Sequence, residues 1–537
     1  MIYTNLLIFI SAIFLFSLDS VGETSDISFI GSLAIYAATL AAFWLLVKRV
    51  FSSSAASLPE GYFGAEKKLM ITALFFFSIA LFFADLKFFL SYLSFNQRFP
   101  AFTSMAGLLI FFSYLVLIWI GAHKNYTAVF HKQHSAATFV LNNIKLNLPI
   151  VLPWVALSLM YDLLALAPWK IITKLLDSHW GDLLFLGLFL LLVLMFLPPL
   201  VRRLWGCTEL PEGPLKEHLT AFCRKQNFAA ELYIWPLYEG RIITAGVLGL
   251  LPGLRYIMLT PALIQNLDLG ELEAVMAHEI GHVKYRHLLL YVLLIAGFSL
   301  FAGFLAEPIL YLSLSMDWLY ALMARDLVSA DTIVTLAGGL PLLVLLLFYF
   351  RFVFGYFIRN FERQADIYVI KVLGSSRQLI SAFNKILVAS GQSGDKPNWH
   401  HFGIGERIAH LELCEKVPSW ITRQDRKIRQ SLIVYAAVLI GAVFLINQIP
   451  VEQMSRSYEG KYIETVLMPK IRGTSDEAAW YRLLGPEQPR LAAADQRQAG
   501  NQRSSAGTRL GSRCRPHRAA AARPGYAGDS VLGQWQC

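Results

Sequence analysis

The sequence AHEIGH at residues 277–282 contains the pattern HExxH, within a segment, Asp268 to His287, that is predicted to form one helix. Positions four apart on a helix differ by about 40° around its axis, so His278 and His282 share one face. Two neutral imidazoles on one face can hold a zinc ion, and the carboxylate of Glu279 can take a proton from the attacking water. The stretch therefore predicts metal-assisted hydrolysis.

The residues around this motif support the helix. Asp268 and Glu271 have the spacing of a capping box, and an apolar stripe follows at helical spacing. His287, five residues past the second motif histidine, is expected at the surface or behind a ligand rather than on the metal. An ordinary helix that carries two histidines by chance is the alternative.

Composition places the chain in a membrane. The 537 residues are 56% hydrophobic and 16% charged, whereas soluble proteins are about a quarter charged. The five cysteines show no CxxC pair, so neither a disulfide framework nor a thiolate zinc site is predicted. Half of the net charge of +10 comes from the residues after Lys470, and the remainder flanks apolar segments, which argues against nucleic-acid binding.

Nine apolar segments approach the roughly 20 residues that a membrane-spanning helix needs. They are Leu6–Leu18, Ile27–Val47, Leu69–Tyr92, Thr103–Ala122, Leu148–Ala167, Leu183–Leu200, Leu288–Leu314, Ile333–Tyr356 and Ser431–Ile449. The first is short and resembles a signal peptide, but it lacks a basic start and a small-residue cleavage pattern, so a retained span is favoured.

Loop charges predict the orientation, because Lys and Arg accumulate on the cytoplasmic side. The loops after the second and fourth spans are rich in lysine, and the alternate loops carry few basic residues. The segments 201–287 and 357–430 are then cytoplasmic. We expect a multi-pass protein, in a bacterial inner membrane, whose catalytic site faces the cytoplasm.

The domain prediction follows from these spans. Residues 1–200 form an N-terminal membrane domain with six candidate spans, and residues 201–430 form the catalytic domain with two inserted spans, 288–314 and 333–356. A last span at 431–449, an extramembrane segment at 450–480 and a disordered tail at 481–537 complete the chain.

A soluble stretch of mixed character precedes the HExxH helix. Residues 214–225 are predicted to be helical, and residues 231–236 and 255–260 are short β-rich runs between glycines. The free edge of a strand shortly before the helix can pair with an extended substrate backbone. Packing against the helix is the simpler role for such a strand.

Most catalytic zinc sites have three protein ligands, so another is needed. The candidate segment is NFERQAD at residues 360–366, after the eighth span. Glu362 and Asp366 are four residues apart and share a helix face. One of them can bind the metal, and the other can hold a ligand histidine through its second ring nitrogen.

Taken together, three pieces of the sequence resemble peptidase family M48, a group of membrane zinc metallopeptidases that includes the CAAX prenyl protease and HtpX-like proteases. The pieces are LEAVMAHEIGHVKYRH at 272–287, NFERQAD at 360–366 and HFGIGERI at 401–408, and the resemblance covers roughly residues 209–412. It implies one zinc ion per chain, held by His278, His282 and Glu362.

The resemblance also implies roles for the other residues of the motifs. Glu279 is the general base and acid, and Asp366 orients a ligand histidine. His401 stabilises the oxyanion, although His400 adjoins it, and Arg407 helps to position the substrate or the active-site helices. Two positions depart from the family pattern: Phe402 replaces a usual proline, and Thr244-Ala245 stands near a usual Asn-Ala pair.

The predicted fold is a predominantly α-helical multi-span membrane protein with a small α+β zincin-like catalytic domain. The predicted function is a membrane-bound zinc-dependent metalloendopeptidase that hydrolyses peptide bonds of membrane-associated or misfolded proteins, with the lipid bilayer as its surroundings. Two alternatives remain: a non-catalytic scaffold or transporter with a relic motif, and an intramembrane protease of the site-2 type.

Overall fold

The computed structural model describes residues 2–18, 25, 27–53, 59–95, 98–130, 135–166, 174, 181–237, 243–325, 330–390 and 402–469. The chain divides into two compact units, Met1–Tyr462 and Ile463–Cys537. In the second unit the described part is 463–469, which contains the π-helix η6 (Ile463–Leu467). The predicted tail at 481–537 lies outside the described residues.

Eight helical segments of the described chain are long and apolar enough to cross a membrane, which confirms the multi-span helical fold. They comprise α2 (Phe29–Phe51), α3 (Pro59–Ala84), α5 (Pro100–Phe130), α6 (Ala136–Ala165), α8 (Gly181–Leu204), α12 (His287–Leu314), the continuous run α14 (Ala330–Phe348), η5 (Tyr349–Phe354) and α15 (Gly355–Leu373), and α18 (Ser419–Ile446). The first of the nine expected spans is α1 (Ile2–Leu18), which at 17 residues is shorter than these eight.

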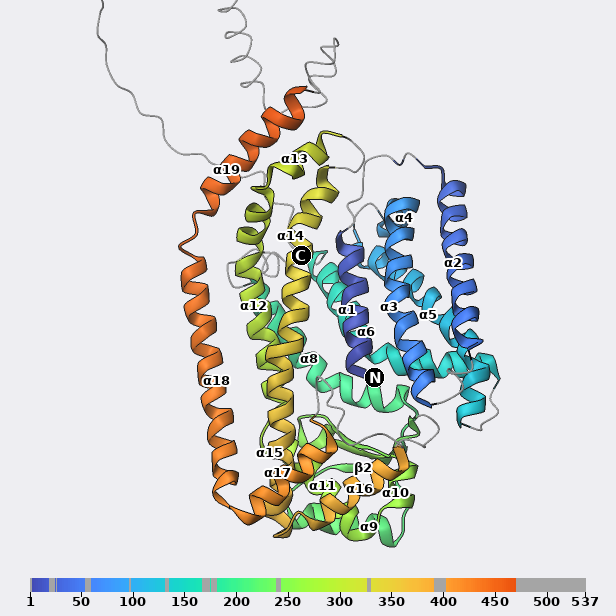
Figure 1. Cartoon of the computed structure of the whole chain (residues 1–537), viewed down its shortest axis with the longest axis vertical. Helices are drawn as coiled ribbons and strands as arrows, with labels where there is room; N and C mark the ends of the chain where they lie inside the picture. Colours follow the sequence, from blue (N-terminus) through green and yellow to red (C-terminus); the bar gives the residue numbers. More distant parts are fainter. Residues whose placement is uncertain are drawn as a thin grey trace, which may run out of the picture. The chain divides into compact units, whose positions relative to one another are not determined.

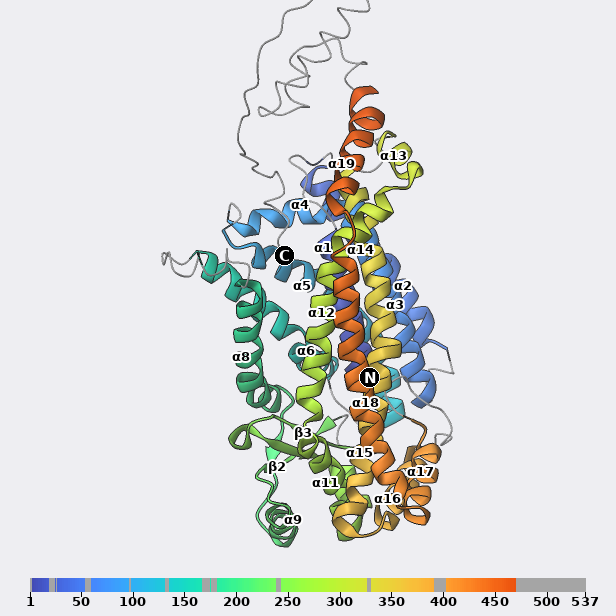
Figure 2. The same ribbon diagram turned by 90° about the vertical axis from the view of Figure 1, so that its left-hand side faces the viewer.

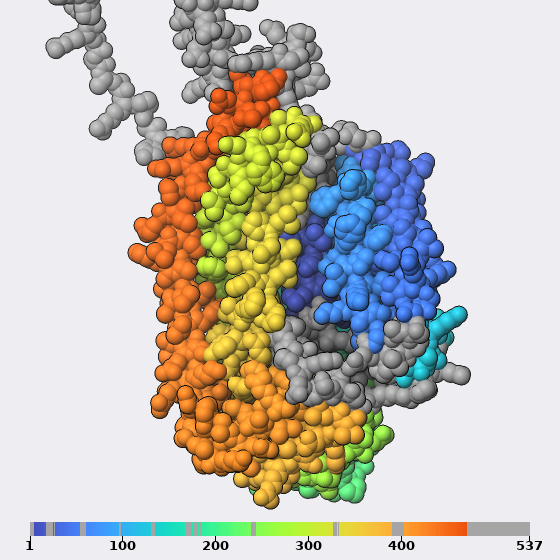
Figure 3. Space-filling model, in the orientation of Figure 1, coloured from blue at the N-terminus to red at the C-terminus, as the bar shows by residue number. Residues whose placement is uncertain are grey.

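The membrane helices of the first unit form two groups (Figures 1 and 2). Helices α2, α3, α5 and α6 pack around a buried core that contains Phe43, Phe111 and Trp119. Helices α12, α14 and α18 pack together on the other side. Helix α1 contacts both α3 and α14, and it lies between the two groups in the space-filling view (Figure 3). The short helix α1 therefore joins the two groups.

Two charged residues of the spans have local structural roles. The third span was expected to continue to Tyr92, but α3 ends at Ala84, and the φ of 48° at Asp85 breaks the helix before α4 (Leu86–Ser91) and η2 (Tyr92–Ser94). Asp162 of α6 accepts a hydrogen bond of 2.8 Å from the backbone N–H of Ala101, in the first turn of α5. Such a carboxylate satisfies a donor that the helix itself leaves free.

The remaining elements are short, and most of them build the catalytic region. They are β1 (Thr208–Glu209), α9 (Pro214–Lys225), β2 (Glu231–Ile234), β3 (Ala245–Leu248), η4 (Pro252–Leu254), β4 (Tyr256–Leu259), α10 (Pro261–Asn266), α11 (Leu269–Lys284), α13 (Asp317–Met323), α16 (Arg377–Ser390), α17 (Ile404–Lys416) and α19 (Val451–Tyr462). Helix α9 has the predicted bounds, and both predicted strands are present.

The strand that precedes the HExxH helix is not at the edge of its sheet. The strand order is β1-β2-β4-β3, so β4 lies between β2 and β3. Strand β4 runs parallel to β2 and antiparallel to β3, with Val247 opposite Ile257. The edge nearest α11 is therefore β3, a strand that we expected only as a glycine-rich connection.

The HExxH helix begins as predicted and ends earlier. Asp268 caps α11, and the reciprocal hydrogen bonds with Glu271 complete the capping box. The helix ends at Lys284 because Arg286 has a left-handed φ of 58°, and His287 begins α12 instead. The expectation of one helix to His287 is therefore wrong, and this break decides where the side chain of His287 lies.

Glu271 links this cap to α16, so neutralising it should destabilise the protein. Its Oε2 accepts from the Asp268 N–H at 2.9 Å and from Lys385 Nζ at 2.6 Å, and its Oε1 accepts from Ser381 at 2.6 Å. Burial raises the pKa of Glu271, but the hydrogen bonds of Lys385 and Ser381 outweigh it and hold the pKa below 4.5. Glu271→Gln keeps an acceptor for the cap and loses the charge, at a cost of about 1 kcal/mol.

The sign of the pH dependence follows from the lowered pKa. The charge of Glu271 contributes its full stabilisation above pH 4.5 and loses it as the pH falls through the lower folded-state value. Thermal unfolding in detergent should therefore separate wild type from Glu271→Gln at about pH 7, and the difference should shrink as the pH is lowered below 4.5. A difference in unfolding temperature that does not change with pH would contradict the role assigned to the charge of Glu271.

Candidate metal centre

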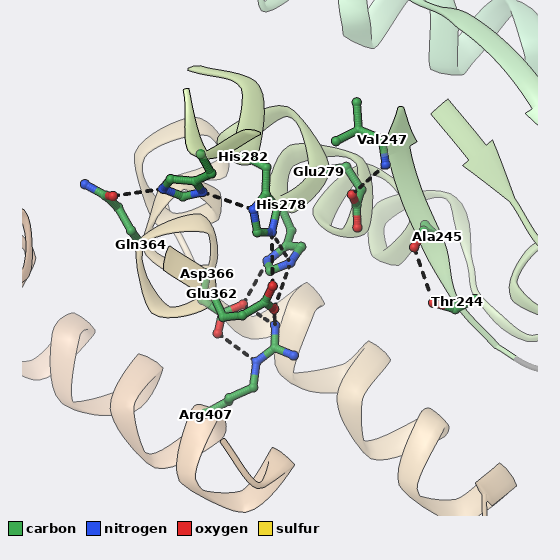
Figure 4. Close-up of polar contacts among 11 residues, drawn as sticks. Thr244, Ala245, Val247, His278, Glu279, His282, Glu362, Gln364, Asp366 and Arg407 are labelled. Atoms are coloured by element: carbon green, nitrogen blue, oxygen red, sulfur yellow. Dashed lines mark hydrogen bonds and ion pairs between the residues drawn. The ribbon is translucent and has the colours of Figure 1, made fainter. Parts of the chain in front are cut away.

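Three donor side chains from two helices converge in the catalytic region: His278 and His282 of α11 and Glu362 of α15 (Figure 4). The Nε2 atoms of the two histidines are 3.3 Å apart, and they lie 3.7 and 3.4 Å from the Oε2 and Oε1 atoms of Glu362, respectively. Tetrahedral zinc with bonds of about 2.1 Å spaces its ligand atoms about 3.4 Å apart. Both the donor types and their separations fit zinc.

A close approach of the two helices makes this convergence possible. Gly281 of α11 faces α15, where an added Cβ would lie 3.0 Å from Tyr368 Cβ and 3.2 Å from Ala365 Cα. A residue with a side chain would hold the helices farther apart. The glycine within HExxH therefore lets Glu362 reach the two histidines, which lie on the same side of α11.

The second nitrogen of His278 meets a buried ion pair. Its Nδ1 lies 2.9 Å from Oδ1 of Asp366, a carboxylate that is 1% exposed. Arg407 of α17 donates to both oxygens of Asp366, at 2.6 and 2.9 Å. Burial opposes the charge on Arg407, but the adjacent Asp366 outweighs it and raises the pKa of the guanidinium. Arg407 thus holds the carboxylate that orients His278.

Glu279 lies between the metal donors and the sheet edge. Its Oε2 accepts a hydrogen bond of 3.0 Å from the backbone N–H of Val247 in β3. Desolvation of the partly exposed carboxyl raises the pKa of Glu279 above its ordinary value. The same effect lowers the pKa of His282 to about 3, so this imidazole is neutral, as a metal ligand must be.

The third sequence piece is only partly described. His400 and His401 lie outside the described residues, so the role expected of His401 has no structural counterpart. Phe402, at the usual proline position, lies under the guanidinium of Arg363, with 3.8 Å between Cζ and the ring centroid. Thr244 precedes β3 and makes two hydrogen bonds with Thr260. The Thr244 N–H donates to Oγ1 of Thr260, and that hydroxyl donates to the carbonyl oxygen of Thr244.

Three residues near the centre had no role in the sequence prediction, and a fourth, His287, was expected either at the surface or behind a ligand. His287 lies directly behind His282, Gln364 and Asp425 continue from it, and Val247 holds the general-base candidate. Gln364 stands inside the motif NFERQAD, so its position was a usable signal. Val247 and Asp425 carry no local signal, because backbone pairing and helix packing bring them to the site.

A cavity of about 890 Å³ opens beside the donor atoms. Strand β3, Trp205 and Trp235 line one part, and Glu279 and Glu362 line another. Membrane helices close it with largely apolar side chains, which are Phe63 of α3, Leu146 of α6, and Leu288 and Tyr291 of α12. Asn5 of α1 also lines it. The cavity therefore lies between the metal centre and the membrane helices.

Part of this chain is similar to known proteins. Residues 209–415 match the sequence model of peptidase family M48. No curated protein matches the chain. Among solved structures, the chain is similar to the crystal structure of S. mikatae Ste24p, with 18% identity over 70% of this chain and 97% of that chain, and a TM-score of 0.43.

Proposed function

We propose that this chain, whose residues 209–415 match the sequence model of peptidase family M48, is a membrane-bound zinc-dependent metalloendopeptidase acting on membrane-associated or misfolded proteins. One observation carries the proposal. The side chains of His278, His282 and Glu362 present donor atoms at the spacing of tetrahedral zinc, with Glu279 beside them. Such a set leaves one position of the metal open for chemistry.

The mechanism assigns each described residue a separate task. Bound zinc would supply Lewis acidity, which acidifies a water molecule and polarises the scissile carbonyl. Glu279 takes the proton of the attacking water and passes it to the leaving amine. Asp366 holds the imidazole of His278 through Nδ1, and Arg407 holds Asp366. We propose His401 as the oxyanion donor from the family resemblance alone.

The edge of β3 is the proposed docking place for the substrate backbone. Within the described residues, β3 pairs with β4 on one side, and its other edge faces the cavity at Val247. An extended peptide that adds to this edge runs past Glu279. Backbone pairing of this kind places a scissile bond near the metal with little dependence on side chains.

The surroundings of the cavity favour membrane-associated substrates. Side chains of membrane helices line it, so a chain segment that leaves the bilayer has a short path to the metal. We propose that the peptidase domain comprises residues 201–430 with its two inserted spans. From the loop charges we further propose that the site faces the cytoplasm. We propose a bacterial inner membrane as the location.

The test uses the purified, detergent-solubilised full chain and an unfolded model protein as substrate. Chelation should abolish cleavage, and added Zn²⁺ should restore it, because the proposed chemistry needs the metal. Metal content measured alongside activity shows whether one zinc per chain is bound. Cleavage that continues after all zinc has been removed by the chelator would contradict the proposal. A purified chain that binds no zinc would contradict it as well.

Two alternative functions make different demands on this site. A scaffold or transporter with a relic motif requires no metal, and the buried Asp366–Arg407 pair behind His278 argues against it, since a relic site has no need of a held ligand. An intramembrane protease takes a ligand from within a span, whereas Glu362 follows the predicted span 333–356 and lies in α15, which packs against α11.

A further inference from the structure

His287 is the most buried ionisable side chain beside the metal donors, with 0% of it exposed. The left-handed residue Arg286 turns the chain so that His287 starts α12 behind α11. Its Nδ1 lies 3.0 Å from Nδ1 of His282, and its Nε2 lies 3.0 Å from Oε1 of Gln364. Its ring stacks on Phe361, with centroids 4.5 Å apart.

The chain of contacts continues to a carboxylate. Nε2 of Gln364 donates to Oδ1 of Asp425 at 2.7 Å, and Lys371 donates to the other oxygen, Oδ2, at 2.9 Å. Asp425 belongs to α18 and Gln364 to α15. Four helices, α11, α12, α15 and α18, therefore contribute to one line of polar groups that ends at His282.

The carboxylate of Asp425 determines which atom donates and which accepts in each hydrogen bond of this line. An ionised carboxylate only accepts, so the amide of Gln364 turns its NH₂ toward Asp425 and its oxygen toward His287. His287 must then carry its proton on Nε2 and present a bare Nδ1. That Nδ1 accepts from His282, whose proton is thereby held on Nδ1. The Nε2 of His282, which faces the other donor atoms, is left free to bind a cation.

We infer that His287 is a positioning residue for the metal centre: it fixes the tautomer and ring orientation of His282, and Gln364 and Asp425 fix those of His287. This inference rests on the proposed zinc chemistry. The two ligand histidines are then held differently, His278 by a carboxylate and His282 by a neutral imidazole. Partners of this kind change metal affinity by about 10–100-fold when removed.

Two substitutions at the same position separate the hydrogen bond from the volume of the side chain. His287→Phe keeps a ring to stack on Phe361 and removes the acceptor. His287→Asn loses the stacking and keeps an oxygen near the position of Nδ1, which can still accept from His282. If the hydrogen-bond acceptor is what positions His282, the asparagine variant should bind zinc more tightly than the phenylalanine variant, although phenylalanine packs better.

The measurement is zinc affinity of the full chain in detergent, by competition with a chelator, with the absorption spectrum of the Co²⁺-loaded protein as a second readout. His287→Phe should weaken zinc binding by about 10–100-fold and shift the cobalt bands, and His287→Asn should recover most of the affinity. His218→Phe, at a half-exposed histidine of α9 paired with Glu273, is the control and should change neither readout.

The outcomes separate the inference from the proposed function. Wild-type affinity and an unchanged cobalt spectrum in His287→Phe would overturn the inference and leave the zinc peptidase intact. A wild type that binds no zinc would overturn the proposed function first. If His287→Phe fails to fold, Asp425→Leu tests the same line from its partly exposed end. It should weaken zinc binding in the same direction, and an unchanged affinity would overturn the inference.

Discussion

Replacing Glu279 by glutamine should lower peptidase activity by about 10²–10⁴-fold while zinc stays bound. The amide oxygen of glutamine can still accept the hydrogen bond from the Val247 N–H, so the backbone contact with β3 remains. The amide cannot take a proton from water, so the step assigned to the carboxylate fails. Turnover of an unfolded model protein, measured with the zinc content of the same sample, tests both halves of this expectation.

A matched variant exists on the same helix. Glu273→Gln makes the same chemical change six residues earlier in α11, where the carboxylate pairs with His218 at the surface. Its activity should stay near that of wild type, because surface ion pairs contribute about 0–1 kcal/mol. Retention of more than about a tenth of the activity in Glu279→Gln would remove this residue from the proposed mechanism.

Enlarging Gly281 should disable the metal centre without touching a ligand. An added Cβ already lies 3.0–3.2 Å from Tyr368 and the backbone of Ala365, and valine adds two methyl groups at this contact. Overpacking of this kind costs about 1–3 kcal/mol and moves the backbone. Glu362 would move away from His278 and His282, so zinc affinity should fall by at least about tenfold.

The control for this prediction is another glycine of α11. At Gly270 an added Cβ would make ordinary contacts of 3.5 and 3.6 Å, so Gly270→Ala should bind zinc like wild type and gain up to about 1 kcal/mol from helix propensity. Gly281→Ala should lie between wild type and Gly281→Val. Equal zinc affinity for wild type and Gly281→Val would show that the spacing of α11 and α15 does not control the site.

The short-range features of this protein could be predicted because they depend on residues close in sequence. His278 and His282 are four residues apart, so they share one face of their helix. Glu362 and Asp366 are also four residues apart and share one face of theirs. Asp268 and Glu271 start α11 as a capping box should. Apolar length alone predicted the spanning helices, since crossing a bilayer needs a fixed number of helical residues.

Features that depend on distant packing were predicted poorly. The sheet order puts β3 at the edge and β4 inside, although β4 is the strand adjacent to α11 in sequence. Strand pairing is decided by contacts between segments, and the apolar alternation of a four-residue strand carries little information about its neighbours. The hydrogen bond from Val247 to Glu279 follows from that pairing, so the sequence contained no sign of it.

The sequence by itself determined the membrane class, the helix faces that carry the candidate metal donors and the chemistry of those donors, because each follows from composition or from the geometry of one helix. Only the tertiary structure decided which groups stand behind those donors. The sequence left His287 either at the surface or behind a ligand, on a continuing helix; the helix breaks at the left-handed residue Arg286, and this break places His287 against His282. A single backbone angle, held by the packing of α11 against α12 and α15, brings that residue to the site.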